Sequence, residues 1–303
     1  MSDSLRPADD SPDDGTISWR QLWDQTAAST GRSEARWLCE EASGAFGDEF
    51  LAVLDELVTE RPIAHLDSML ARLRTGEPLQ YVLGHWSFRR LDLLVDRRVL
   101  IPRPETEFVA EIALGFARTL LDSGTARPLL LADLGTGSGA IGLSLALELP
   151  RGAAEVWLTD LSADALDVAR ANTAGLGIAG GSVRFGQGAW FEALPADLHG
   201  RLAMVVSNPP YVGHSDPEVE PIVRDWEPSM AVFADGDADG LDAVRALAVG
   251  SADWLQTGGW LVVEIGSGQG SGALQVLTSA GLTEVEVRRD LAGRDRIAVA
   301  RKK

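Results

Sequence analysis

The sequence predicts an α/β protein built on a parallel sheet, and three observations lead to that prediction. From Leu129 onward, short apolar runs alternate with segments of helical periodicity. The apolar runs are continuous, as in strands that helices cover on both faces. A glycine-rich turn over residues 135–139 follows the first run directly and opens the next helix. Residues 16–76 show helical spacing only, which predicts a separate helical bundle ahead of the sheet.

The composition is that of an ordinary globular protein, with 45% hydrophobic and 24% charged residues in a chain of 303. No apolar run approaches the roughly 18 residues that span a bilayer. The first 15 residues lack the basic and then apolar order of a secretory signal. A single cysteine, Cys39, and four scattered histidines offer no metal-ligand spacing, so Cys39 is expected to be a buried thiol. We expect a cytoplasmic protein with no metal and no membrane association.

The net charge of −18 argues against broad binding to nucleic acid, which depends on Lys and Arg to replace counterions. A local basic patch is still compatible with that total, because part of the acidity comes from the N-terminal residues. We expect a monomer that forms no stable complex with nucleic acid.

The chain divides into four parts. Residues 1–15 are acidic and poor in apolar side chains, which predicts a disordered tail. In residues 16–76, apolar side chains such as Leu38, Leu57 and Leu66 recur at helical spacing. Residues 77–98 contain a glycine and alternate polar and apolar side chains, which predicts a β-hairpin connector. Residues 99–303 make up the α/β domain.

The α/β domain opens with a stiff loop, Leu100-Ile101-Pro102-Arg103-Pro104-Glu105-Thr106-Glu107, that leads into a helix ending near residue 121. Glu105 or Thr106 is placed to serve the first turn of that helix. Helices are then expected at 141–149, 163–174, 241–255 and 272–280. Strands are expected at 129–132, 154–159, 183–185, 202–206, 260–264, 285–287 and 297–299.

The loop after the first strand runs from Asp133 through Leu134 to Gly135, Thr136, Gly137, Ser138 and Gly139. Its glycines allow a tight turn and a close approach of the backbone to a ligand, and the helix start offers free N–H groups. Tight strand-to-helix turns also use glycine for geometry alone, so this pattern by itself is a weak signal.

Asp160 makes the interpretation of that loop more specific. It ends the second strand, where a carboxylate is placed to accept hydrogen bonds from ribose hydroxyls. A pyrophosphate would favour a helix start without a neighbouring negative charge, whereas Asp133 suits a ligand with a cationic amino-acid end. Together the two acids and the glycine loop indicate S-adenosylmethionine.

The fourth strand ends in Ser207-Asn208-Pro209-Pro210-Tyr211. The carboxamide oxygen of Asn208 and the carbonyl of Pro209 are suited to accept both hydrogens of a planar NH2 group, with Tyr211 stacked on its face. A strand end with a proline-rich turn is the alternative. In the usual strand order 3-2-1-4-5, however, this motif neighbours the glycine loop, which places a methyl donor beside a grip for an amine.

The motifs resemble those of the HemK-type class I methyltransferases, the peptide chain release factor glutamine N5-methyltransferases. The resemblance covers nearly everything after the acidic tail. Besides the three motifs above, it rests on Gly76-Glu77-Pro78-Leu79-Gln80-Tyr81-Val82-Leu83-Gly84, Phe88, the 100–107 loop, Glu227-Pro228, Val263-Glu264-Ile265-Gly266 and Gln269-Gly270. The 100–107 loop separates this family from a sister group that modifies a ribosomal-protein glutamine.

The resemblance implies a Rossmann-like seven-stranded sheet of order 3-2-1-4-5-7-6 with the last strand antiparallel. It implies methyl transfer to the glutamine of a Gly-Gly-Gln motif in release factors, with the bundle recognising that substrate protein. The catalytic and substrate-binding residues would be Asn208, Pro209, Pro210 and Tyr211. S-adenosylmethionine would contact Gly135, Thr136, Gly137, Ser138, Gly139, Asp160, Trp190 and Asn208. One departure is Ala189, where the family usually has Asp at the adenine edge.

Other hypotheses remain open at this point. The Asn-Pro-Pro-Tyr motif also occurs in adenine-N6 methyltransferases of nucleic acid, although these would show a basic face or a target-recognition domain. A ribosomal-protein glutamine is another candidate substrate. A dinucleotide oxidoreductase would explain the glycine loop but leave Asn208 without a role, and a non-catalytic binding module predicts no turnover.

Overall fold

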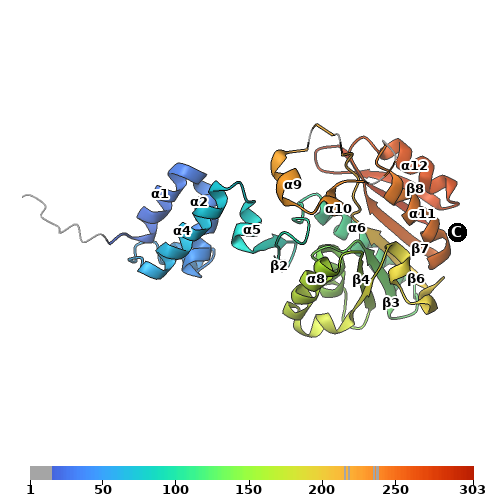
Figure 1. The fold of residues 1–303 in the computed structure, drawn as a ribbon. Helices are drawn as coiled ribbons and strands as arrows, with labels where there is room; N and C mark the ends of the chain where they lie inside the picture. Colours follow the sequence, from blue (N-terminus) through green and yellow to red (C-terminus); the bar gives the residue numbers. More distant parts are fainter. Residues whose placement is uncertain (1–15, 215, 218, 235, 237–238) are drawn as a thin grey trace, which may run out of the picture. The chain divides into compact units, whose positions relative to one another are not determined.

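The computed structural model describes residues 16–214, 216–217, 219–234, 236 and 239–303. The acidic tail predicted for residues 1–15 lies outside this range. The contacts group the chain into two compact units, one ending at Leu83 and the other beginning at Gly84 (Figure 1).

The smaller unit is helical. Its first helix begins with a capping box, in which the Ser18 hydroxyl accepts a hydrogen bond from the Gln21 backbone and the Gln21 side chain accepts one from the Ser18 backbone. Trp19 packs edge-on against Phe50, with ring centroids 6.0 Å apart. Cys39 is buried as predicted, and burial raises the pKa of its thiol to about 11. The helices are α1 (Trp19–Thr30), α2 (Arg32–Ser43), α3 (Asp48–Ala52), α4 (Glu60–Arg74) and α5 (Leu79–Leu83).

Two local expectations for this part of the chain are wrong. Leu57 was expected in the core but is 63% exposed, because α3 ends at Ala52 and the helical spacing stops there. Residues 79–83 were expected in a hairpin but form α5. The guanidinium of Arg72 donates hydrogen bonds to the carbonyls of Tyr81 and Val82 and so holds the end of this helix. The hairpin is therefore shorter than 77–98, with strands β1 (His85–Phe88) and β2 (Leu91–Leu94).

The larger unit contains a seven-stranded sheet of order β5-β4-β3-β6-β7-β9-β8. In chain order this is 3-2-1-4-5-7-6, so the predicted topology is confirmed. The last strand pairs antiparallel with both of its neighbours, also as predicted. The strands are β3 (Leu129–Leu134), β4 (Ala154–Asp160), β5 (Val183–Gln187), β6 (Leu202–Ser207), β7 (Leu255–Glu264), β8 (Thr283–Arg289) and β9 (Asp295–Arg301).

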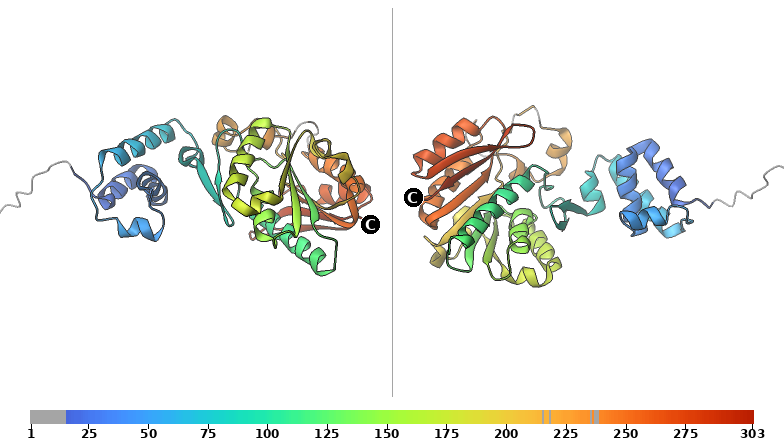
Figure 2. Two further views of the ribbon diagram at one scale, coloured as in Figure 1. Left: turned by 90° about the horizontal axis from the view of Figure 1, so that it is seen from below. Right: turned by 180° about the vertical axis from the view of Figure 1, so that it is seen from behind.

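Helices cover both faces of the sheet. The rear view shows α6 lying across one face, and α6 packs against α7 (Figure 2). Side chains of α11 and α12 pack with alternate residues of the central strands in one apolar cluster that includes Leu134, Val205, Leu247, Leu261 and Leu277. The helices are α6 (Thr106–Asp122), α7 (Ala140–Glu148), α8 (Ala163–Gly175), α9 (Pro221–Trp226), α10 (Ser229–Val232), α11 (Asp242–Trp254) and α12 (Gly270–Ser279), with 3-10 turns η1 (Gly177–Ser182), η2 (Trp190–Ala193) and η3 (Ala196–Leu198).

Strand β7 begins at Leu255 instead of at Trp260, where the apolar pattern begins. Gly258 has a φ of +79°, and a Cβ on Gly259 would stand 2.9 Å from the carbonyl oxygen of Leu202. The strand is distorted there, so its alternation is hidden in the sequence. Within the described residues, no helix is both long and apolar enough to cross a membrane.

Candidate active site

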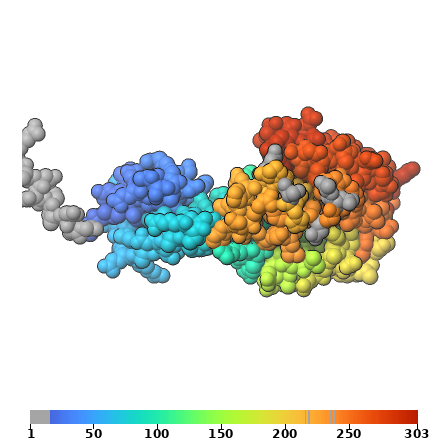
Figure 3. Space-filling model, turned by 45° about the horizontal axis from the view of Figure 1, so that its top comes forward, coloured from blue at the N-terminus to red at the C-terminus, as the bar shows by residue number. Residues whose placement is uncertain are grey.

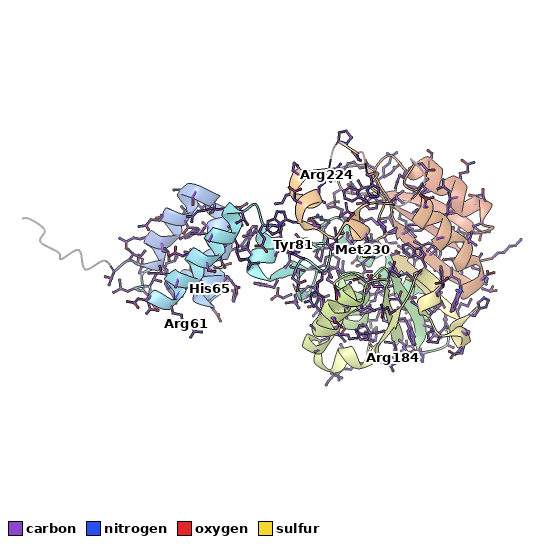
Figure 4. All side chains as sticks on the ribbon, in the orientation of Figure 1. Arg61, His65, Tyr81, Arg184, Arg224 and Met230 are labelled. Carbon is purple, nitrogen blue, oxygen red and sulfur yellow. The ribbon has the colours of Figure 1, made fainter. Side chains whose placement is uncertain are left out.

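A cavity of about 270 Å³ lies beyond the carboxyl ends of β3, β4 and β6 in the larger unit. Its walls come from residues 98–106, the loop after β3, the end of β4, the loop after β5, the motif after β6 and residues 228–231. Met230 of α10, labelled in Figure 4, belongs to this wall and is 52% exposed. The gold and orange region that contains α9 and α10 lies on the surface of the larger unit (Figure 3). The cavity therefore has a rim with an apolar side chain open to solvent.

Most of the predicted site residues meet in this cavity. Its lining includes Gly135, Thr136, Gly137, Ser138, Asp160, Trp190, Asn208 and Pro210. Three predicted residues lie beside it and do not form part of its wall. Gly139 adopts a φ of +90° at the start of α7, Pro209 is buried, and Tyr211 points toward Glu264.

Asp133 holds the glycine loop in place through buried hydrogen bonds. Its Oδ2 accepts hydrogen bonds from the Thr136 hydroxyl at 2.7 Å and from the Gly142 backbone at 2.8 Å. The side chain is buried, and burial raises its pKa to about 6. We expected Asp133 beside the cationic end of a ligand, but it does not line the cavity. It ties the loop to the first turn of α7 instead.

Asp160 links the second strand to the glycine loop. Its Oδ2 accepts a hydrogen bond from the Gly137 backbone and its Oδ1 accepts one from the Ser162 backbone, each at 2.9 Å. Burial raises the pKa of this carboxyl, while the backbone donors oppose that rise. Because a carboxylate oxygen has more than one acceptor site, both oxygens retain capacity for further donors such as hydroxyl groups.

Trp190 lines the same cavity and has a strained backbone. Its φ of +47° lies in the left-handed region, where a bulky side chain is rare. Such strain concentrates at ligand sites. A Cβ on Gly135 would stand 3.6 Å from the Trp190 ring, so glycine leaves the indole room against the loop. Ala189 also lines the cavity, so this wall has a methyl group at the position where the sequence departs from the usual Asp.

Asn208 is held by a chain of hydrogen bonds between polar side chains, called the relay below. Its Nδ2 donates a hydrogen bond to the Thr106 hydroxyl at 3.1 Å, and Thr106 donates to Glu264 Oε2 at 2.7 Å. The Tyr211 hydroxyl donates to the other oxygen of Glu264 at 3.2 Å. Glu264 is fully buried, and burial raises its pKa to about 7. Burial also raises the pKa of Tyr211, so its hydroxyl keeps its proton for this bond.

Two of the cavity's walls are joined by Glu227, another buried acid. The guanidinium of Arg103 pairs with Glu227 Oε1, and the Ile101 backbone donates a hydrogen bond to Glu227 Oε2 at 3.1 Å. Arg97 lies over the Trp226 ring, 4.0 Å from its centroid. An ion pair, a hydrogen bond and a cation–ring contact therefore join the chain before α6 to the end of α9 and the segment between α9 and α10.

Comparisons with known proteins point to one family. Residues 21–84 match the model of the PrmC N-terminal domain, and residues 116–224 match that of the methyltransferase small domain. Release factor glutamine methyltransferase of Xylella fastidiosa is 44% identical over 226 residues, which span 75% of this chain and 77% of the relative. The enzyme of that name from Bordetella pertussis is 41% identical over 267 residues, 88% and 93% of the two chains.

The chain belongs to the release factor glutamine methyltransferase family. The Vibrio cholerae member is 37% identical over 255 residues, 84% of each chain. The fold is also found in the crystal structure of the hMettl16 catalytic domain in complex with MAT2A 3′UTR hairpin 6. That structure has a TM-score of 0.52 at 14% identity and covers 82% of this chain and 84% of its own. At that identity the likeness concerns the fold alone.

Sequence reasoning quoted the motifs of this family but missed the role of two residues in them. Thr106 was expected to serve the first turn of α6, yet its hydroxyl donates to Glu264, and Glu105 at the helix start makes no side-chain capping bond. Glu264 was quoted as part of a motif, and no role was predicted for it. It ends an apolar strand next to β6, and an acid at a strand end is the same signal that led to Asp160.

Proposed function

We propose that this protein transfers a methyl group from S-adenosylmethionine to the side-chain amide nitrogen, N5, of a glutamine in peptide chain release factors. The glutamine is that of the Gly-Gly-Gln motif, and the reaction takes place in the cytoplasm, where release factors act. The observation that carries this proposal is the orientation of Asn208 in the cavity. Because its Nδ2 is engaged by Thr106, its Oδ1 is the end left to accept from a substrate NH2 group.

The residues around the cavity fit S-adenosylmethionine. Asp160 offers carboxylate oxygens for ribose hydroxyls, Trp190 offers an aromatic face for adenine, and the loop 135–138 offers backbone groups for the amino-acid end. When bound, this group supplies an electrophilic methyl on its sulfonium. The methyl at Ala189 gives up one possible bond to adenine but leaves the indole face available.

A glutamine amide is a poor nucleophile, and Asn208 and Pro209 are proposed to compensate by positioning it. Its nitrogen lone pair is delocalised into the carbonyl, so the amide reacts only when it is well placed. The Asn208 Oδ1 on the cavity wall and the carbonyl of Pro209, which lies beside that wall, would accept its two hydrogens and aim the nitrogen into the cavity. Both acceptors strengthen their bonds as positive charge develops on the nitrogen. The nitrogen would gain the methyl as the methyl–sulfur bond breaks and a neutral thioether leaves, and it would then lose one proton to water. Positioning and electrostatics thus carry the transfer without a strong general base.

The choice of release factors as substrates is supported by the names that the relatives carry. The helical bundle of residues 16–76 is proposed to recognise that protein. A ribosomal-protein glutamine and a nucleic-acid adenine present the same planar NH2 group to Asn208. The net charge of −18 disfavours the nucleic acid.

The test is methyl transfer from labelled S-adenosylmethionine to four separate acceptors. These are a release factor, the same factor with the Gly-Gly-Gln glutamine replaced by alanine, a ribosomal-protein mixture and DNA. We expect label in the intact release factor alone. Label in the alanine-substituted factor would overturn the proposed substrate. Label in ribosomal protein or DNA, with none in the intact release factor, would also overturn it.

A further inference from the structure

We propose that Thr106 and Glu264 are positioning residues that determine which end of the Asn208 carboxamide faces the substrate. This inference rests on the proposed function and adds to it the origin of Asn208's orientation. The three residues come from distant parts of the chain: the start of α6, the end of β7 and the motif after β6. Thr106 and Asn208 line the cavity, and hydrogen bonds connect Asn208 through Thr106 to the buried Glu264.

The two ends of a carboxamide have nearly the same shape but opposite hydrogen-bonding character. The oxygen only accepts and the NH2 only donates. A substrate amide that presents its NH2 group needs an acceptor opposite it. If Asn208 were turned by 180° about its last side-chain bond, two NH2 groups would face each other. Packing alone discriminates weakly between these two states, so a polar neighbour must do so.

Glu264 provides that discrimination through Thr106. A carboxylate oxygen has no hydrogen to give, so the Thr106 hydroxyl donates its only hydrogen to Oε2 over 2.7 Å. The hydroxyl then has only lone pairs left to offer Asn208, and these accept from Nδ2 at 3.1 Å. The buried negative charge therefore sets the direction of both bonds. Its effect is strong because the carboxylate is shielded from water.

The remaining groups around Glu264 keep this arrangement in place. The Tyr211 hydroxyl occupies Oε1, so rotation of the carboxylate would sacrifice a second bond. Burial has the largest effect and raises the pKa of Glu264, as does the negative charge of Glu105, whereas the hydrogen bond from Thr106 and the positive charge of Arg296 favour the ionised carboxylate. Arg296, the second residue of β9, is itself buried, so its attraction is poorly screened. If Glu264 gained a proton on Oε2, it would donate to Thr106 and free the Thr106 hydrogen to turn Asn208 around.

The first arm of the test separates Asn208 orientation from folding. Thr106→Val keeps the shape and removes the hydroxyl, whereas Thr106→Ser restores it. Thr119→Val makes the same change at an exposed position of the same helix and is the matched control. We expect Thr106→Val to lower kcat about 10- to 100-fold while the Kd for S-adenosylmethionine changes less than about twofold. Thr106→Ser should recover most of the lost kcat.

The second arm uses pH. In the wild-type protein kcat should fall as the pH drops through the pKa of Glu264, because protonation reverses the relay. Glu264→Gln removes the titrating group, so its kcat should be lower but should lack this acidic limb. An acidic limb of unchanged position in Glu264→Gln would overturn the assignment of Glu264.

The outcomes also separate this inference from the proposed function. Absence of methyl transfer by the wild-type protein to every acceptor would refute the proposed function itself. An active wild-type protein together with an equally active Thr106→Val would refute the positioning role. A Thr106→Val protein that loses donor binding and thermal stability in parallel with kcat would also refute it, since Thr106 would then be structural.

Discussion

Arg103 and Glu227 form an ion pair between the loop before α6 and the segment that joins α9 to α10. The Glu227 side chain is only 2% exposed, whereas that of Arg103 is 29% exposed. The acid also accepts a hydrogen bond from the Ile101 backbone. Pro102 and Pro228, next to these two residues in the chain, both line the cavity. The pair thus sets the spacing of two walls of the site.

Loss of the Glu227 charge should therefore destabilise the larger unit. Glu227→Gln leaves the guanidinium of Arg103 without its carboxylate partner, and we expect the free energy of unfolding to fall by about 2 kcal/mol. Urea denaturation of the variant and the wild type measures this. The matched control is Glu286→Gln, which breaks an exposed pair with Arg288 and should cost less than about 1 kcal/mol. Equal losses in the two variants would contradict the role of the buried pair.

Asp160 should govern affinity for the methyl donor. Asp160→Asn replaces one carboxylate oxygen by an NH2 group, which then faces the backbone N–H of Gly137 or of Ser162 with the wrong polarity and disturbs the loop. We expect the Kd for S-adenosylmethionine to rise by about 30-fold, equivalent to about 2 kcal/mol. Isothermal titration calorimetry gives this value directly. Asp167→Asn, an exposed change in α8, should leave the Kd unaltered.

Asn208→Ala should separate chemistry from donor binding. The variant lacks the acceptor for the substrate NH2, so we expect methyl transfer to fall by at least about 100-fold. The Kd for S-adenosylmethionine should change by no more than about threefold, because the loop 135–138 and Asp160 are untouched. Single-turnover rates and equilibrium dialysis measure the two quantities. Full activity in this variant would refute the proposed mechanism.

The buried Glu264 should make stability depend on pH in a defined direction. Its pKa rises from 4.5 to about 7 in the folded protein, so the folded state binds a proton more tightly than the unfolded state. Its contribution to stability is fully present below pH 4.5 and is lost as the pH rises toward about 7. Glu264→Gln removes this loss. The unfolding free energy of the variant, relative to the wild type, should therefore increase over that range, and a decrease would show the opposite linkage.

Two glycines in helices should respond oppositely to the same change. A Cβ on Gly142 would stand 2.1 Å from Leu158 Cδ2 and 3.0 Å from Asp133 Oδ2, so Gly142→Ala should cost about 1–3 kcal/mol. Gly115 in α6 has open space around that position, and Gly115→Ala should stabilise by up to about 1 kcal/mol. Thermal melts of both variants check this. A stabilised Gly142→Ala would show that α7 is not packed closely on β4.

Much of the sheet was accessible from sequence because its strands are buried on both faces. Every residue of β6 is buried, and such a strand appears as an uninterrupted apolar run. The site was predicted from the strand ends, since Asp160 ends β4 and Asn208 stands directly after β6. Parallel strands bring their carboxyl ends to one edge, so the glycine loop and Asn208, which follow adjacent strands, were expected to be neighbours.

The hydrogen bonds from Asn208 through Thr106 to Glu264 could not be predicted from the sequence. Thr106 and Glu264 lie 158 positions apart, and no local pattern records that one side chain will meet the other. Thr106 was instead predicted to serve the first turn of the helix, because threonine is common at helix starts. The direction of the Asp133 side chain was also not predictable. A carboxylate beside a ligand-binding loop gives the same sequence pattern whether it faces the ligand or the backbone.

The position of β9 between β7 and β8 has a consequence for biosynthesis. A ribosome makes β8 before β9, yet β8 joins the sheet only through β9. Until residues 295–301 have emerged, β7 presents an open edge, the attachment site of β8 is missing, and Arg296 is not yet near Glu264. Nascent chains halted before Asp295 should therefore be prone to aggregation and should not yet bind the methyl donor in the mature geometry.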